Sequence, residues 1–168
     1  ESFPTFLPEL KKVITDQTIL SDVGSVKSCV HNEIENFGLN SYFIGGHPMA
    51  GSEKSGYRHS SDILLENAFF ILTPTSQTPS EKVKSYSEFV KSIGAIPLEL
   101  SFEEHDRVVA AISHLPHMIA SSLVNLVEQE DKKGYMSSVA AGGFKDITRI
   151  ASSNSHMWQN ICSKNKIF

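Results

Sequence analysis

The change in hydrophobic pattern near residue 100 constrains the fold of this chain more than any other feature. Before it, short apolar runs alternate with helical patterns, which predicts an α/β layer with parallel strands. After it, apolar residues recur at spacings of three, four and seven, at Val108, Ile112, Leu115, Ile119 and Leu126. We therefore expect an α/β region over residues 1–100 and an all-helical region over residues 101–168.

Regular patterns mark both helices and strands in the first hundred residues. Helices are expected over Phe6–Ile14, Ser25–Phe37 and Ser80–Ile93. Strands are expected over Thr18–Val23, Tyr42–Ile44, Ala68–Leu72 and Ile96–Leu100. The chain opens on a helix and contains no GxGxxG turn. We therefore expect a fragment that holds part of a Rossmann-type parallel sheet, followed by a C-terminal helical domain.

Charge and composition exclude several classes of function. The chain has 15 basic and 19 acidic residues, and the basic ones form no stripe that could follow a nucleic-acid backbone. No apolar run approaches the roughly 18 residues of a membrane span, and no signal peptide opens the chain, so we expect a cytoplasmic protein without a membrane partner. Cys29 and Cys162 form no CxxC pair, which indicates reduced thiols rather than a disulfide or a zinc site.

His47 lies in a glycine-rich segment, 45–56, that follows a predicted strand. The segment has no clear period, and Pro48 restricts the backbone directly after the histidine. We expect the imidazole on a constrained turn at the carboxyl end of the strand, where open α/β sheets bind ligands. A neutral histidine there can accept a proton near pH 7. The alternative is a surface loop whose histidine only caps a neighbouring group.

Ser25 closes a predicted strand and opens a predicted helix. Its first role is expected to be N-capping of that helix. Its hydroxyl could also orient His47 or contact a cofactor. The two residues would lie close together if the strands that precede them pair in parallel.

A second group of histidines lies in the helical pattern from Glu103 to Glu128. His114, His117 and Ser121 recur at one-turn spacing, so they form a polar stripe apart from the apolar residues. Pro116 cannot donate to the carbonyl four residues earlier, so the helix should kink or restart between the histidines. Two imidazoles beside such a break indicate either a pocket wall or a solvated face.

A third motif, Ala141–Ala151, carries Lys145 and Arg149 one turn apart. The guanidinium can bind a carboxylate through two parallel hydrogen bonds, and the lysine adds positive potential on the same side. Trp158, the only tryptophan, follows shortly after. The alternative is that Arg149 pairs with Asp146 on the surface and that Trp158 belongs to the core.

Taken together, these motifs resemble the prephenate dehydrogenase family. The resemblance covers nearly all 168 residues and rests on DVGSVK at 22–27, GGHPMAGSEKSG at 45–56, HD and SHLPH at 105–117, and GGFKDITRIA followed by MW at 142–158. It implies a Rossmann-type domain that binds NAD or NADP, followed by a helical domain through which two subunits form a homodimer. The implied small-molecule substrate is prephenate or arogenate.

The resemblance also implies a role for individual residues. His47 matches the catalytic histidine, Ser25 the serine that assists it, and Arg149 the arginine that binds the ring carboxylate of the substrate. The cofactor is expected to contact Gly24 and Ser25. The remaining substrate-binding residues are expected to be Ser52, Glu53, His114, His117, Lys145 and Trp158.

Two other functions stay open on the residues alone. A metal-dependent hydrolase could use His47, the His105–Asp106 pair, His114 and His117, but no HExxH or other recognised ligand spacing occurs, and we expect no metal. A non-catalytic dimerising or regulatory module could retain the helical core. The intact histidine, serine and arginine of the motifs argue against that second alternative.

Overall fold

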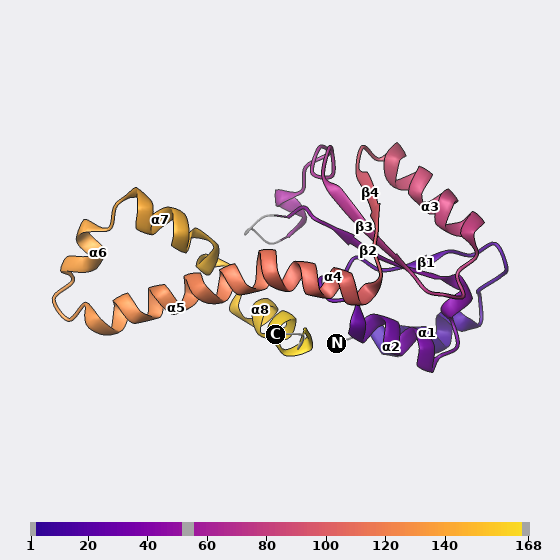
Figure 1. Ribbon diagram of the computed structural model, residues 1–168, viewed down its shortest axis with the longest axis horizontal. Helices are drawn as coiled ribbons and strands as arrows, with labels where there is room; N and C mark the ends of the chain where they lie inside the picture. The colour runs from indigo at the N-terminus through magenta and orange to yellow at the C-terminus, as the bar shows by residue number, and fades with distance from the viewer. Residues whose placement is uncertain (1–2, 52–55, 166–168) are drawn as a thin grey trace. The chain divides into compact units, whose positions relative to one another are not determined.

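The computed structural model describes residues 3–51 and 56–165, which form two compact units (Figure 1). The first, here called the sheet unit, extends to Arg107, and the second, the helical unit, begins at Val108. The division falls inside one helix, α4 (Phe102–Val109). The predicted succession of an α/β region and an all-helical region is confirmed.

The sheet unit contains four strands in the order β1-β2-β3-β4. They are β1 (Leu20–Ser21), β2 (Phe43–Pro48), β3 (Phe69–Pro74) and β4 (Ile96–Glu99). The β1–β2 and β3–β4 pairs are parallel, each with a crossover helix between its strands: α2 (Ser28–Asn36) and α3 (Ser80–Ser92).

The middle pair of the sheet, β2 and β3, is antiparallel. The prediction of parallel pairing is therefore wrong at this pair. A parallel return needs a long crossover, usually a helix. The described part of the connection between β2 and β3 instead holds turns and one short 3-10 helix, η2 (Tyr57–His59).

Strand β2 is buried on both faces because its side chains alternate between two layers of helices (Figure 1). On the face covered by α1 (Phe3–Lys11) and α2, the core consists of Phe43, Leu7, Ile34 and Leu39. On the face covered by α3, it consists of Ile44, Phe70, Leu72, Val90 and Ala95. The neighbouring residues in β2, Phe43 and Ile44, thus anchor opposite layers. A short 3-10 helix, η1 (Asn40–Tyr42), leads into the strand.

Gly45 and Gly46 belong to β2 rather than to the loop expected from their composition. They are glycines because other chain segments pass very close. A Cβ on Gly46 would lie 2.5 Å from the backbone oxygen of Asp22, and one on Gly45 would lie 2.3 Å from Thr73 Oγ1. His47 is consequently a strand residue, opposite Ile71 on β3, rather than a turn residue.

The described part of the helical unit contains no strand, as the sequence predicts. After the end of α4 come a π-helical segment η3 (Ala110–His114), α5 (Leu115–Glu130), α6 (Tyr135–Val139), α7 (Gly142–Thr148), the 3-10 helix η4 (Arg149–Ser152) and α8 (Ser155–Lys164). Pro116 lies in the first turn of α5, directly after the π-helical segment. The expected interruption of the helix beside the histidines is confirmed, and a missing N–H at Pro116 accounts for it.

The burial of the long helix is the reverse of its polarity. His114 and His117 are 7% and 5% exposed, whereas Ile112, Leu115 and Leu126 are 62%, 57% and 58% exposed. The alternative of a solvated histidine face is therefore wrong.

The helical run Phe102–Glu130 is long and apolar enough to cross a membrane by length and composition alone. Core helices of soluble proteins can have the same length and hydropathy, so this feature is weak evidence for a membrane span.

Candidate functional site

The carboxyl ends of β1 and β2 lie side by side because these strands are parallel. Asp22, directly after β1, ties the two ends together. Its carboxylate accepts hydrogen bonds from the backbone N–H of Gly46 at 3.2 Å and of Gly24 at 2.8 Å. The predicted proximity of the segment around Ser25 to the strand end that carries His47 is confirmed.

His47 is the first member of a chain of three hydrogen-bonded side chains. Its Nδ1 lies 2.7 Å from Nε2 of His105, and Nδ1 of His105 lies 2.7 Å from Oδ1 of Asp106. His105 and Asp106 are both fully buried in α4. The sheet unit therefore links the predicted catalytic histidine to a buried carboxylate through a second imidazole.

Asp106 also caps the N-terminus of α2. Oδ1 accepts from the backbone N–H of Lys27 at 2.7 Å, and Oδ2 accepts from the backbone N–H of Ser28 at 2.8 Å and from its hydroxyl. Burial alone would raise the pKa of Asp106, but the hydrogen bonds from His105, Lys27 and Ser28 outweigh it and lower the pKa to about 2. The carboxylate is thus ionised throughout the physiological range.

This cap corrects the expectation for Ser25. Helix α2 begins at Ser28, with Lys27 at the N-cap position and no side-chain cap from its own segment. The helix therefore starts three residues later than predicted, because a carboxylate far along the chain supplies the capping oxygens. Ser25 is half-buried in the turn between β1 and α2.

Lys27 is fully buried and contacts both Asp106 and Gly46, the residue before His47. Its ammonium pairs with Asp22 and donates to the backbone oxygen of Gly46 at 2.7 Å, while its backbone N–H donates to Asp106. Burial lowers the pKa of Lys27, and the Asp22 carboxylate opposes that shift. The sequence did not predict Lys27 as a site residue, and it suggested Asp106 only as a metal ligand of the alternative hydrolase. Their positions could have indicated a role, because Lys27 lies in the motif DVGSVK and Asp106 in the HD pair.

The helical unit brings together three of the predicted pocket residues. The rings of His117 and Trp158 stack with centroids 3.7 Å apart and planes 5° from parallel. His114 meets Trp158 edge-on at 5.9 Å, and its Nδ1 lies 3.3 Å from the side-chain nitrogen of Asn165. Sequence reasoning missed Asn165, which carries no distinctive motif.

Two buried polar atoms in this cluster, Nδ1 of His117 and Nε1 of Trp158, have no hydrogen-bond partner among the described residues. Nε2 of His117 lies 3.3 Å from the Ser121 hydroxyl. Burial lowers the pKa of His117, and the backbone of Ile150 opposes this shift. The neutral imidazole and the indole N–H can therefore serve a polar ligand.

Lys145 and Arg149 lie one turn apart, in α7 and at the start of η4, and both are exposed. These two elements pack against α5. The pair presents positive charge on one side of the helical unit, which suits an anionic ligand. Ser52 and Glu53 lie outside the described residues, so their predicted roles are untested.

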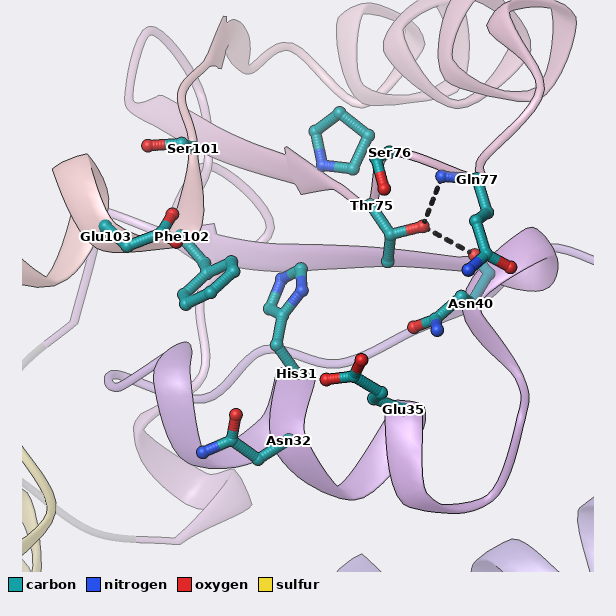
Figure 2. Close-up of a pocket in the computed structure, with 11 residues that line it drawn as sticks. His31, Asn32, Glu35, Asn40, Thr75, Ser76, Gln77, Ser101, Phe102 and Glu103 are labelled. Atoms are coloured by element: carbon teal, nitrogen blue, oxygen red, sulfur yellow. Dashed lines mark hydrogen bonds between the residues drawn. The ribbon is translucent and has the colours of Figure 1, made fainter.

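A polar pocket of about 390 Å³ occupies a different part of the sheet unit (Figure 2). It lies where β3 and β4 end, whereas His47 lies at the far end of β2, since β2 and β3 are antiparallel. His31 lines it, with Nε2 2.9 Å from Thr73 Oγ1 and its ring stacked on Phe102 at 4.6 Å. Burial and the nearby Lys27 charge lower the pKa of His31 to about 4. The pocket lining does not include His47, His105 or Asp106.

The described residues include no group of three or more His, Cys, Asp or Glu side chains placed to hold a metal ion. His47 and His105 instead bind each other, and His105 binds Asp106. These three side chains therefore form a hydrogen-bonded network at the carboxyl end of β2.

Two family models match the chain. Residues 1–98 match the nucleotide-binding domain of prephenate dehydrogenase, and residues 101–167 match its dimerization domain. Prephenate dehydrogenase from Bacillus subtilis is 44% identical over 155 residues, covering 91% of this chain and 42% of that protein.

Solved structures with both sequence and fold similarity include two dehydrogenases. Prephenate dehydrogenase from Aquifex aeolicus, in complex with hydroxyphenyl propionate and NAD+, superposes with a TM-score of 0.88 at 37% identity. Arogenate dehydrogenase from Synechocystis superposes with a TM-score of 0.81 at 27% identity. Both matches cover 98% of this chain and 58% of the other. The chain thus spans about half the length of the proteins it matches.

Proposed function

Because the chain belongs to the prephenate dehydrogenase family, we propose that the whole protein oxidatively decarboxylates prephenate or arogenate in tyrosine biosynthesis, with NAD or NADP as hydride acceptor. The observation that carries this proposal is the chain from His47 through His105 to Asp106, at the carboxyl end of β2. The carboxyl ends of strands are the usual ligand side of a dinucleotide-binding sheet.

His47 is the general base of the proposed reaction. Prephenate is a cyclohexadiene with a hydroxyl and a carboxylate on its ring. The imidazole accepts the hydroxyl proton while hydride leaves the same carbon, and loss of carbon dioxide then makes the ring aromatic. Ser25, in the neighbouring turn, is proposed to assist the histidine.

The turn from Asp22 to Ser25 fits one edge of a nicotinamide cofactor. Gly24 is exposed, and a Cβ there would lie 2.9 Å from Asp22 Oδ2, so the absence of a side chain keeps the turn tight and its surface open. We assign Gly24 and Ser25 to cofactor contact. When bound, the cofactor supplies the acceptor for the hydride.

Substrate binding is assigned to residues of the helical unit. Arg149 binds the ring carboxylate and Lys145 adds positive charge, while His114, His117 and Trp158 contact the rest of the molecule. The Aquifex relative binds an aromatic carboxylate, hydroxyphenyl propionate, which agrees with such a set of residues. Ser52 and Glu53 join this set by their place in the family motif.

We further propose that the protein is a cytoplasmic homodimer that associates through the domain of residues 101–168, with residues 1–100 in the nucleotide-binding domain. The exposed apolar side chains of α5, Leu115, Ile119 and Leu126, support this proposal because a large apolar stripe in water favours association. Sedimentation of the full-length protein should give twice the monomer mass, and a monomer at micromolar concentration would contradict it.

The function is tested by assaying the full-length protein with each combination of prephenate or arogenate and NAD+ or NADP+. The expected result is reduced nicotinamide and carbon dioxide in equal amounts, with an aromatic product. Failure with all four combinations would favour a non-catalytic module. Turnover that requires an added metal and stops on chelation would favour a metal-dependent enzyme instead.

A further inference from the structure

We propose that Asp106, acting through His105, holds His47 in the tautomer that carries its proton on Nδ1 and its lone pair on Nε2. Nε2 is then the basic atom of the site. This inference rests on the proposed function in one respect, the role of His47 as the base. Asp106 and His105 are positioning residues in this assignment, because they act through His47 rather than on the substrate.

Asp106 fixes which atom donates and which accepts in each of these hydrogen bonds. An ionised carboxylate only accepts hydrogen bonds. It receives the backbone N–H groups of Lys27 and Ser28, and the Ser28 hydroxyl, all of which stabilise the ionised form. The contact of 2.7 Å between Oδ1 and Nδ1 of His105 therefore requires the proton to be on Nδ1 of that ring.

The same reasoning passes the direction on to His47. A neutral His105 with its proton on Nδ1 has a lone pair on Nε2, so Nε2 can only accept. Nδ1 of His47 lies 2.7 Å from that atom and must donate. A neutral imidazole has one N–H, which places the lone pair of His47 on Nε2.

Lys27 keeps both ends of this chain in place. Its backbone N–H holds Asp106, and its ammonium holds the backbone oxygen of Gly46, the residue before His47. Both His105 and Asp106 are fully buried, so water does not compete for their hydrogen bonds. The orientation of the catalytic ring is therefore set before any ligand binds.

Asp106→Asn in the full-length protein tests the assignment. In the place of Oδ2 the amide oxygen can still accept from the backbone N–H of Ser28. In the place of Oδ1 the NH₂ group faces Nδ1 of His105 as a donor and can no longer accept from the backbone N–H of Lys27. His105 then carries its proton on its own Nε2 and donates a hydrogen bond to Nδ1 of His47. Since Nδ1 of His47 now accepts, the proton of His47 lies on Nε2 of that ring. With its basic atom blocked, kcat should fall about 10²- to 10⁴-fold while KM changes less than about threefold.

Glu104→Gln is the matched control. It removes the same charge from the same helix, but Glu104 is exposed, and its carboxylate accepts hydrogen bonds from the nearby backbone N–H and hydroxyl of Ser101. Its kcat should stay within about twofold of wild type. An equal loss of kcat in both variants would show a general charge effect and overturn the assignment.

The tautomers themselves are read from ¹⁵N chemical shifts of the histidine rings, with wild type and Asp106→Asn at a pH where His47 is neutral. The expected result is Nδ1–H for His47 in wild type and Nε2–H in the variant. Nε2–H in wild type, or a doubly protonated His105, overturns the proposal even if the variant does not fold. Absence of dehydrogenase activity would count against the proposed function alone, because the spectrum needs no turnover.

Discussion

The two histidine clusters of this protein differ in how completely their polar atoms are paired. In the sheet unit, His47, His105 and Asp106 bond one another in sequence, and α2 satisfies the carboxylate. In the helical unit, His117 and Trp158 stack on each other. Nδ1 of His117 and Nε1 of Trp158 are nevertheless buried without hydrogen-bond partners among the described residues. An unpaired buried polar atom lowers the stability of the fold by about 1 to 3 kcal/mol. The helical cluster carries this destabilisation, and the sheet cluster does not.

This difference indicates a division of labour. A fully paired network is rigid and holds one side chain in one protonation and orientation, as a catalytic base requires. Buried donors and acceptors without partners instead gain free energy when a ligand pairs with them. Substitutions in the sheet cluster should therefore act on kcat, and substitutions in the helical cluster on KM.

The largest expected effect is that of His47→Asn. Loss of the general base should lower kcat about 10²- to 10⁴-fold with nearly unchanged KM. His59→Asn is the control, because His59 is an exposed histidine of the same unit and should leave kcat unchanged. Steady-state kinetics of the full-length variants check this. Retained turnover in His47→Asn would remove His47 from the mechanism.

Arg149→Ala should have the next largest effect. The substrate carboxylate would lose two charged hydrogen bonds, which weakens binding by about 2 to 4 kcal/mol. We therefore expect kcat/KM to fall roughly thirty- to a thousandfold, mostly through a higher KM. Arg149→Lys should recover only part of it, because the planar fork is lost. Since Arg149 is exposed, the unfolding midpoint should hold, as for the control Lys132→Ala. Unchanged affinity for substrate, or a large drop in midpoint, would contradict the assignment.

Gly46→Ala tests the close packing that supports the sheet cluster. The new Cβ would lie 2.5 Å from the Asp22 oxygen and 2.9 Å from the Phe70 ring, so the strand must shift. We expect a loss of about 1 to 3 kcal/mol in the free energy of unfolding, measured with denaturant. At Gly51 a Cβ would meet no atom of the described residues within 4 Å, so Gly51→Ala should change the free energy of unfolding by less than about 0.5 kcal/mol. Equal stability of the two variants would refute the packing argument.

Acid should weaken the sheet unit through Asp106. Its folded-state pKa of about 2 lies below its ordinary value of 3.8, so the carboxylate stabilises the fold above a pH of about 4. That contribution, roughly 2 kcal/mol, should be lost as the pH falls from about 4 to about 2. Unfolding of wild type and Asp106→Asn across this range measures it. The difference in free energy of unfolding between the two proteins should narrow as the pH falls. A difference that stays constant would contradict the lowered pKa of Asp106.

The smallest effect is expected for Trp158→Phe. A phenyl ring can still stack on His117, and the change removes a buried N–H that has no partner. The free energy of unfolding should change by less than about 1 kcal/mol, while KM rises about three- to tenfold if the indole donates to the substrate. A stability loss above about 3 kcal/mol with unchanged KM would show that Trp158 is a core residue instead.

Much of the fold follows from local signals. The prediction for α3 ends within one residue of the observed helix, because Pro79 and Gly94 mark its start and stop. The prediction for the strand at β2 found only its beginning, since Gly45 and Gly46 have low strand propensity. Their place in the sheet depends on Asp22 and Thr73, which approach them only in the folded chain.

The sequence by itself determined the order of elements, the change from α/β to helical structure, and the identity of His47 and Arg149 as candidates. These features depend on periodicity and motifs that extend over a few residues. Tertiary structure decided the antiparallel pairing of β2 with β3, the burial of His114 and His117, and the partners of His47. The hydrogen bond between His47 and His105 joins residues 58 positions apart, and the cap of Asp106 on α2 joins residues 79 positions apart. Hydrogen bonds over such separations leave no local pattern, because they exist only once the strands and helices have packed.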